Sequence, residues 1–332
     1  MLSIAIIGAG RIGQIHAANL AARAADHKDV ALAGICDASE AAARALAGRL
    51  DAAVIDLDEA LEGSGSNAVL IASPTDTHSD FIERAARAGK AIFCEKPVDL
   101  SAKRIEGVLK IVEAAGVPLF IGFNRRFDPN FASVKARIDD GQIGEVELVT
   151  ILSRDPSPPP VSYIERSGGL FRDMMIHDFD MARFLLGEEP VEVHAVGSSL
   201  VDPEIGAAGD VDTAAVLLKT ASGKIAQISN SRRATYGYDQ RIEVHGQKGL
   251  LRAGNQHETT VELATGAGFT ADPAQNFFLE RYATAYRLQL DAFLAAARGE
   301  QAPRPDGHDG LMAQRLADAA TESAKSGQPV RF

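Results

Sequence analysis

The sequence predicts an α/β protein of two domains, with a doubly wound parallel sheet in the first. Its length of 332 residues exceeds what one hydrophobic core usually organises and fits two domains. Short apolar strands alternate with helical segments over the first third of the chain, which is typical of repeated βα units. Beyond residue 124, most strands follow one another with Gly, Asp and Ser turns between them. We therefore expect a first domain of residues 1–123 and a second of residues 124–332, with the C-terminal helices packed on the sheet of the second domain or back on the first.

The composition indicates a soluble protein of the cytoplasm. Hydrophobic residues make up 46% of the chain and charged residues 24%. The net charge of −11 argues against nucleic acid as a partner, because binding to phosphates requires a basic face. No apolar run reaches the roughly 18 residues that a membrane span needs, and the first residues lack a signal-peptide pattern. Cys36 and Cys94 lie in predicted buried strands, so we expect reduced thiols without a catalytic role.

The first strand, Ser3 to Ile7, leads through a glycine-rich turn into a helix, which is the context of a dinucleotide site. One glycine permits the tight turn, the second lets the backbone approach a pyrophosphate, and the third allows close packing of helix on strand. The anion then lies at the helix N-terminus, where free N–H groups and the helix dipole favour it. The predicted cofactor-binding residues of this turn are Gly8, Gly10, Arg11, Ile12 and Gly13.

An acidic residue ends the second strand, Val30 to Cys36. Asp37 follows Gly13 by 24 residues, where a carboxylate accepts hydrogen bonds from the ribose hydroxyls of an adenosine. The same carboxylate repels a 2′-phosphate, so we expect NAD rather than NADP as cofactor. The alternative is that Asp37 only caps the helix that follows.

Two more strand ends carry polar residues, after Ala68 to Ala72 and after Ala91 to Cys94. Ligands of parallel sheets bind beyond the carboxyl ends of the strands, so these residues join the predicted cofactor site. Lys96 stands out because a lysine fixed before a proline, directly after a buried strand, is held extended and points into that crevice. The alternative is a solvated Glu95–Lys96 charge pair in a turn. The predicted contacts here are Ser73, Pro74, Thr75, His78, Glu95 and Lys96.

The stretch GGLFRDMMIHDFDMARFLLG, 168–187, combines large apolar residues with an imidazole and carboxylates. As one continuous helix it places Asp173 and His177 at i and i+4, and His177 and Asp180 at i and i+3, so that all three project from one face. Because the apolar residues need burial, this polar stripe is expected to line a cavity. Two alternatives stay open, a metal site for Mn²⁺ or Zn²⁺ and a set of hydrogen bonds inside a domain interface.

Three motifs, in this order, resemble those of the Gfo/Idh/MocA family of NAD(P)-dependent oxidoreductases. They are GAGRIG near the N-terminus, CEKP from Cys94 to Pro97 and GGLFRDMMIHDFD from Gly168 to Asp180. The resemblance covers nearly the whole chain. It implies a Rossmann domain followed by an α+β domain with a large open, mostly antiparallel sheet, and a cis bond between Lys96 and Pro97.

Within the family, the segments GFNRRFDPNF, SRDPSPPPVSYI and YGYDQRIEVHG are similar to those of members that oxidise inositol. The implied reaction is NAD-dependent oxidation of a cyclic polyol to a ketone, with myo-inositol to 2-keto-myo-inositol (scyllo-inosose) expected. Ser153 and Asp155 stand where some inositol enzymes have histidine and asparagine. The expected substrate contacts are Lys96, Arg126, Asp155, Tyr163, Asp173, His177 and Tyr236.

The resemblance assigns catalytic roles to Lys96, Asp173 and His177. A secondary alcohol loses a hydroxyl proton as hydride leaves its carbon, and histidine is suited to accept that proton. Lys96 is expected to stabilise developing charge on the oxygen, and Asp173 to bind a hydroxyl or raise the basicity of the imidazole.

Other outcomes stay open. One alternative is a family member acting on a sugar, an amino-inositol or a dihydrodiol, and another is a non-catalytic NAD-binding regulator. Because an antiparallel sheet with one exposed apolar face favours burial between subunits, we also expect a homotetramer or a dimer.

Overall fold

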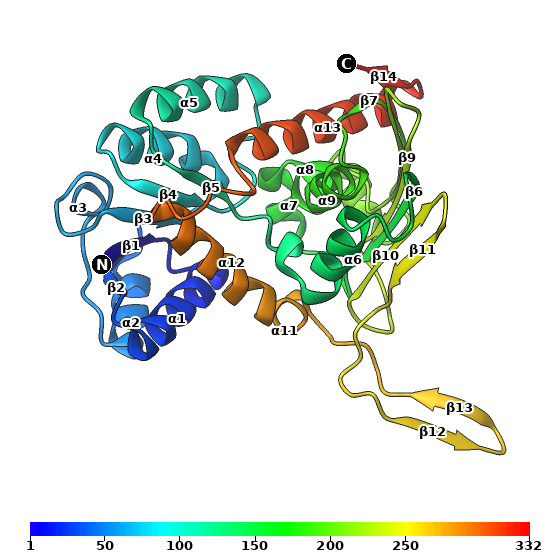
Figure 1. Cartoon of the computed structure of the whole chain (residues 1–332), viewed down its shortest axis with the longest axis horizontal. Helices are drawn as coiled ribbons and strands as arrows, with labels where there is room; N and C mark the ends of the chain where they lie inside the picture. Colours follow the sequence, from blue (N-terminus) through cyan, green and yellow to red (C-terminus); the bar gives the residue numbers. More distant parts are fainter. The chain divides into compact units, whose positions relative to one another are not determined.

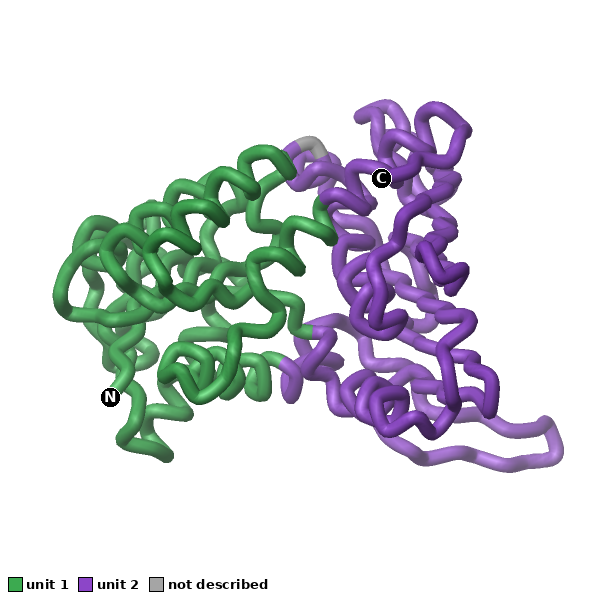
Figure 2. The backbone as a smooth tube through the Cα atoms, turned by 45° about the horizontal axis from the view of Figure 1, so that its top comes forward, with its two compact units in different colours: residues 1–124, 286–314 green, residues 125–285, 315–332 purple. Residues whose placement is uncertain are grey.

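The computed structural model describes the backbone of residues 1–332 and all side chains except that of Glu165. The chain divides into two compact units, which Figure 2 distinguishes by colour. Unit 1 comprises residues 1–124 and 286–314, and unit 2 comprises residues 125–285 and 315–332. The chain thus crosses from the first unit to the second and returns to each once.

Unit 1 contains a parallel five-stranded sheet, as the alternating pattern predicts. Its strands are almost wholly buried, because helices cover a parallel sheet on both faces. The order is β2-β1-β3-β4-β5, so the winding reverses between β1 and β3 and opens a crevice at their carboxyl ends. The strands are β1 (Leu2–Ile7), β2 (Val30–Cys36), β3 (Ala68–Ile71), β4 (Ala91–Cys94) and β5 (Leu119–Ile121).

Two helices of unit 1 begin directly after a serine that caps them. Ser39 and Ser101 cap α2 and α5 with side-chain oxygens, as short polar residues do at helix starts. Phe293 of α12 packs against Phe93 and Phe120 of the sheet, which anchors this late helix in the unit. The helices are α1 (Arg11–Asp26), α2 (Glu40–Leu50), α3 (Leu57–Leu61), α4 (Thr75–Arg87), α5 (Ala102–Ala115), most of α12 (Ala283–Ala297) and the start of α13 (Gly307–Ser326).

Unit 2 is built on a seven-stranded sheet of order β11-β10-β6-β9-β8-β7-β14. Neighbouring strands of the described backbone are antiparallel except for β6 and β9, which run parallel, so the prediction of a mostly antiparallel sheet is confirmed. The strands are β6 (Val146–Arg154), β7 (Pro190–Ser198), β8 (Thr213–Thr220), β9 (Ile225–Ser231), β10 (Asp239–Gly246), β11 (Gly249–Ala253) and β14 (Val330–Arg331).

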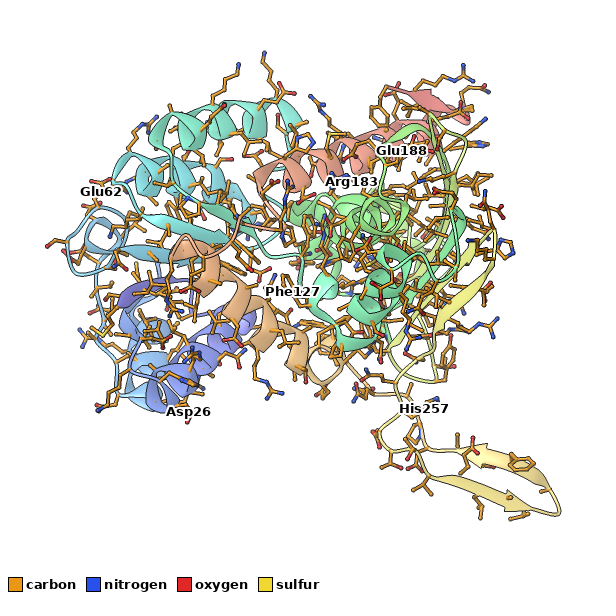
Figure 3. All side chains as sticks on the ribbon, viewed as in Figure 1. Asp26, Glu62, Phe127, Arg183, Glu188 and His257 are labelled. Carbon is orange, nitrogen blue, oxygen red and sulfur yellow. The ribbon has the colours of Figure 1, made fainter. Side chains whose placement is uncertain are left out.

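Helices lie against one face of this sheet (Figure 1). The short helices of the unit are η1 (Asn124–Phe127), α6 (Pro129–Asp139), α7 (Val161–Ser167), α8 (Gly169–Asp173), α9 (Ile176–Leu186), α10 (Pro203–Ala207) and α11 (Phe278–Arg281). A separate hairpin of β12 (Glu262–Thr265) and β13 (Gly268–Ala271) projects from the unit, with His257 at its base (Figure 3). No helix among the described residues is long and apolar enough to cross a membrane.

The segment from Gly168 to Gly187 is not the single helix that its composition predicts. A turn at Met174 and Met175 separates α8 from α9. The N–H of Met175 bonds to the oxygen of Leu170, five residues back instead of four, so the regular ladder is interrupted there.

The break changes the relation between two predicted site residues. Asp173 ends α8, whereas His177 lies in the first turn of α9. The expectation that both project from one face of a continuous helix is therefore wrong. The positions of Asp173 and His177 therefore depend on how two short helices are held.

Candidate active site

The first βα turn of unit 1 has the geometry that a dinucleotide phosphate needs. Gly8 has φ of +108°, and a Cβ on Gly13 would lie 1.9 Å from the oxygen of Gly8, so both positions demand glycine. A Cβ on Gly10 would meet nothing within 4 Å, which leaves open space above the start of α1. Gly10 is the N-cap of α1 and supplies no side-chain cap, so an anion can take that place.

Asp37 fixes this turn through its carboxylate. One oxygen accepts a hydrogen bond from the N–H of Ala9 at 2.6 Å, and the other accepts from the N–H of Ser39 at 2.7 Å. The cap of α2 is the hydroxyl of Ser39, so the alternative that Asp37 merely caps this helix is wrong. The carboxylate stands at the end of β2, beside the glycine turn that β1 feeds.

His78 links two loops at the strand ends. Its side chain is buried, with Nδ1 2.7 Å from the oxygen of Pro97 and Nε2 2.9 Å from the oxygen of Ser73. Burial lowers the pKa of this imidazole. Because each ring nitrogen faces a backbone carbonyl, His78 holds the Ser73 and Pro97 loops together. The sequence predicts a cofactor contact at this position.

The EKP turn is held from α1. The Lys96–Pro97 bond is cis, as the resemblance predicts. Glu95 lies 2.7 Å from Nε2 of His16, whose imidazole is fully buried and edge-on to the rings of Phe93 and Tyr286. No sequence pattern connects His16 with this turn, because 79 residues separate it from Glu95.

In unit 2, the parallel pairing of β6 and β9 brings together the residues that follow them. Arg154 and Ser231 are register partners, so Asp155 and Arg232 emerge at the same end of adjacent strands. The N–H of Asp155 bonds to the oxygen of Ser231 at 3.0 Å. β10 begins at this end too, with Asp239 opposite Arg154.

Both predicted tyrosines are engaged with charged groups. The hydroxyl of Tyr163 donates to Oδ1 of Asp173 at 3.1 Å. The hydroxyl of Tyr236 donates to Asp239 at 2.7 Å and accepts from Arg154 at 3.1 Å. Each ring is about half exposed, so each keeps a surface toward solvent.

A buried network holds the start of α9, directly after His177. Asp178 accepts hydrogen bonds from Arg125 at 2.5 Å, from the hydroxyl of Ser153 at 2.6 Å and from Asn230 at 2.8 Å. Three charge-assisted bonds to one buried carboxylate fix its backbone, and this anchor sets α9 independently of α8. Ser153 also accepts from Arg125, so it serves the network from β6.

Arg126 forms an ion pair with Asp180, two residues further along α9. Nε and Nη2 of Arg126 bond to the two carboxylate oxygens at 2.8 and 2.6 Å, and both side chains are largely buried. The guanidinium also lies over the ring of Phe184. This bidentate pair ties η1 to α9, and contact of Arg126 with substrate stays a prediction.

Asp155 has an unusual electrostatic environment. Burial raises its pKa to about 6, against the nearby positive charge of Arg232 and with the negative charge of Asp173 adding to the increase. Asp155 therefore changes charge near the pH at which dehydrogenases work, and its state depends on those two neighbours.

The sequence missed Arg232, Arg125 and Asp178. Each is buried and charged, and only the tertiary structure reveals what it contacts. A signal for Arg232 existed, since it directly follows a strand, but the neighbour of that strand was unknown. Among the described residues, no group of three or more His, Cys, Asp or Glu is arranged to hold a metal ion.

Family models match both parts of the chain. Residues 2–123 match the oxidoreductase family with an NAD-binding Rossmann fold, and residues 135–332 match the C-terminal α/β domain of the same family. Together these matches cover most of the sequence. The chain belongs to the Gfo/Idh/MocA family of oxidoreductases.

The chain is also similar, over nearly its full length, to individual members of the Gfo/Idh/MocA family. The chain is 56% identical to an inositol 2-dehydrogenase of Rhizobium meliloti over 318 residues, which is 96% of this chain and 95% of that protein. It is 46% identical over 333 residues to a myo-inositol 2-dehydrogenase of Thermotoga maritima, which is 100% of this chain and 98% of that protein.

A solved structure of a Gfo/Idh/MocA relative carries ligands. The scyllo-inositol dehydrogenase of Lactobacillus casei, with bound NAD(H) and scyllo-inositol, superposes with a TM-score of 0.92 at 30% identity. The match covers 100% of this chain and 99% of that one. The family, the Rossmann fold and the nicotinamide cofactor are thus shown, and this chain is an oxidoreductase with NAD as its cofactor.

Proposed function

We propose that this protein oxidises a secondary alcohol of myo-inositol to the ketone, forming 2-keto-myo-inositol with NAD as acceptor. The observation that carries the proposal is the match over nearly the full length to inositol 2-dehydrogenases at 56% and 46% identity. The polar cluster of unit 2 supports it, because a ring of neighbouring hydroxyls needs many paired donors and acceptors.

The residues of unit 1 fit the cofactor. Open space above Gly10 and the uncapped start of α1 suit the pyrophosphate. Asp37, anchored by Ala9 and Ser39, suits ribose hydroxyls and opposes a 2′-phosphate, which favours NAD over NADP. When bound, NAD accepts a hydride at C4 of its nicotinamide. Arg11, Ile12, Ser73, Pro74, Thr75, Glu95 and Lys96 complete the proposed contacts, whereas His78 holds the Ser73 and Pro97 loops together.

Three residues carry the proton chemistry in this proposal. His177 takes the hydroxyl proton as the C–H bond gives up its electron pair with the hydrogen. Lys96 donates a hydrogen bond to the reacting oxygen and stabilises its developing negative charge. Asp173 accepts a hydrogen bond from a hydroxyl of the ring. Arg126, Asp155, Tyr163 and Tyr236 are proposed to contact the remaining hydroxyls.

The test is spectrophotometric. The purified protein with NAD and myo-inositol is expected to produce NADH absorbance, with lower rates for hexoses and for NADP. A panel of inositol isomers, sugars, an amino-inositol and a dihydrodiol separates the proposed substrate from other family substrates. NAD binding without turnover of any polyol would instead indicate a regulator.

The proposed base has its own test. His177→Ala is expected to lower kcat at least about 100-fold, the usual contribution of a general base, with unchanged NAD affinity. His308→Ala, at an exposed histidine near the start of α13, is the matched control and should behave as wild type. Full activity of His177→Ala would remove His177 from the mechanism.

A further inference from the structure

Arg232 is a charged residue that is buried in unit 2. Its side chain is 1% exposed, and it ranks among the largest fully buried side chains of the described chain. Its backbone N–H bonds to the oxygen of Asp212 at 2.8 Å, which fixes the residue directly after β9. Burying a guanidinium is costly unless its charge is matched, so the groups around it indicate its purpose.

Two carboxylates surround this guanidinium. Nη2 of Arg232 lies 3.6 Å from Oδ2 of Asp173, a distance of an ion pair that is too long for a hydrogen bond. Asp155 emerges from the adjacent parallel strand at the same sheet end. Nε and Nη2 of Arg232 have no hydrogen-bond partner among the described residues. The positive charge of Arg232 therefore attracts and orients the Asp173 carboxylate without a hydrogen bond to its Oδ2.

The other charges and titratable groups around these carboxylates come from several elements. Asp155 faces Arg125 from η1 and Asp178 from α9, besides Arg232 and Asp173. Asp173 faces Tyr163 from α7. Arg232 is the strongest positive influence on Asp155, and burial opposes it. Arg125 is already bonded to Asp178, whereas Arg232 lies within ion-pair distance of Asp173 and at the same sheet end as Asp155.

We propose that Arg232 is a positioning residue of the substrate site, which holds Asp173 and Asp155 in place as hydrogen-bond acceptors for polyol hydroxyls. The inference rests on the proposed function, because it takes Asp173 and Asp155 as substrate contacts. It adds a residue that touches no substrate itself. An ionised carboxylate accepts hydrogen bonds only, so losing the balancing charge converts an acceptor of the site into a donor.

The experiment uses the full chain with NAD and myo-inositol. Arg232→Met removes the charge, Arg232→Lys keeps it, and Arg233→Met, an exposed neighbour, is the control. For each, kcat, KM for myo-inositol and the dissociation constant of NAD are measured from pH 5 to pH 9. If Arg232→Met does not fold, Arg232→Gln replaces it, since glutamine keeps donors without the charge.

Arg232→Met is expected to raise KM at least about tenfold and to move the acidic limb of kcat/KM up by about one pH unit, because a nearby opposite charge shifts a carboxylate by that order. Arg232→Lys is expected to restore the limb while KM stays raised, because an ammonium lacks the planar fork. NAD affinity and the Arg233→Met control should match wild type. A limb and a KM unchanged in Arg232→Met would overturn the proposal.

A second readout keeps this test separate from the proposed function. The urea midpoint is measured between pH 4.5 and pH 8.5 without substrate. The wild type is expected to lose stability as rising pH ionises the buried Asp155 carboxyl. In Arg232→Met this loss should extend to higher pH, because the positive charge that favours the ionised carboxyl is gone. If wild type oxidises no inositol but this shift appears, the proposed function fails and the charge role of Arg232 stands. An unchanged pH dependence refutes that role whatever the substrate.

Discussion

The ionisation of Asp155 affects the stability of the folded protein as well as the proposed binding of substrate. The chain places it where β6 ends, next to Arg232, and burial raises its pKa to about 6. A carboxyl whose folded pKa is raised stabilises the native state below its unfolded pKa, and this contribution is lost as pH rises through the folded value. The window of loss therefore runs from about pH 4 to about pH 6.

Asp155→Asn is expected to stabilise the protein at pH 7.5 by about 1–2 kcal/mol, because the amide removes the cost of a half-buried charge. The advantage over wild type should shrink toward pH 4, where the wild-type carboxyl is protonated. Urea unfolding at both pH values measures it. The exposed Asp140→Asn is the control, and an equal effect at the two pH values would contradict the assignment.

At the scale of elements, the turn between β1 and α1 shows how glycines divide their tasks. Gly8 and Gly13 are required by the fold, since a side chain at either meets backbone atoms at 2.4 and 1.9 Å. Gly10 has ordinary φ and open space above it, so the fold itself does not require glycine there. We propose that a pyrophosphate approaching the backbone accounts for glycine at this position.

Gly10→Ala is therefore expected to fold normally and to weaken NAD binding at least about tenfold, because the methyl group keeps the pyrophosphate from the backbone. Calorimetry gives the dissociation constant, and thermal unfolding checks the fold.

Gly48→Ala is the matched control, because a Cβ there also meets nothing within 4 Å and the residue lies inside α2. It should leave NAD affinity unchanged and stabilise the helix by roughly 0.5–1 kcal/mol. Wild-type NAD affinity in Gly10→Ala would contradict the cofactor site.

At the scale of the molecule, the sheet of unit 2 has one face without helices among the described residues (Figure 1). Cross-strand partners share a face, and the register links Leu250 with His245, His245 with Leu148, and Leu148 with Ile225. Leu217 and Val196 lie on the same face of β8 and β7, and the apolar members of this row are exposed. We propose that a second copy of the chain covers this face.

Leu217→Glu is expected to convert the proposed dimer or tetramer into a smaller species, because burying a carboxylate in an apolar contact is costly. Light scattering gives the mass of each form. Leu200→Glu, an exposed position outside the strands, is the control. A monomeric wild type, or an unchanged mass in Leu217→Glu, would contradict assembly through this sheet.

The sequence by itself determined the features that near neighbours encode. Alternating apolar runs predicted the parallel sheet, and the glycine spacing predicted the first turn, to which the carboxylate of Asp37 is bonded. The contact of Asp37 with a cofactor stays a prediction. These signals are local, because periodicity and φ preference act over a few residues.

Only the tertiary structure decided what depends on pairing between distant segments. It placed Asp155 beside Arg232, which are 77 positions apart, because β6 pairs with β9. It broke the predicted helix after Asp173, where the N–H of Met175 bonds to the oxygen of Leu170, and it bonded Asp178 to Arg125 and Asn230 from other elements. It returned residues 286–314 to the first unit through packing of aromatic rings. The pattern of apolar residues along the chain determines whether a segment forms a helix or a strand. Its neighbours in the fold are determined by sheet pairing and by buried charges, and these interactions leave no signal within a short window of sequence.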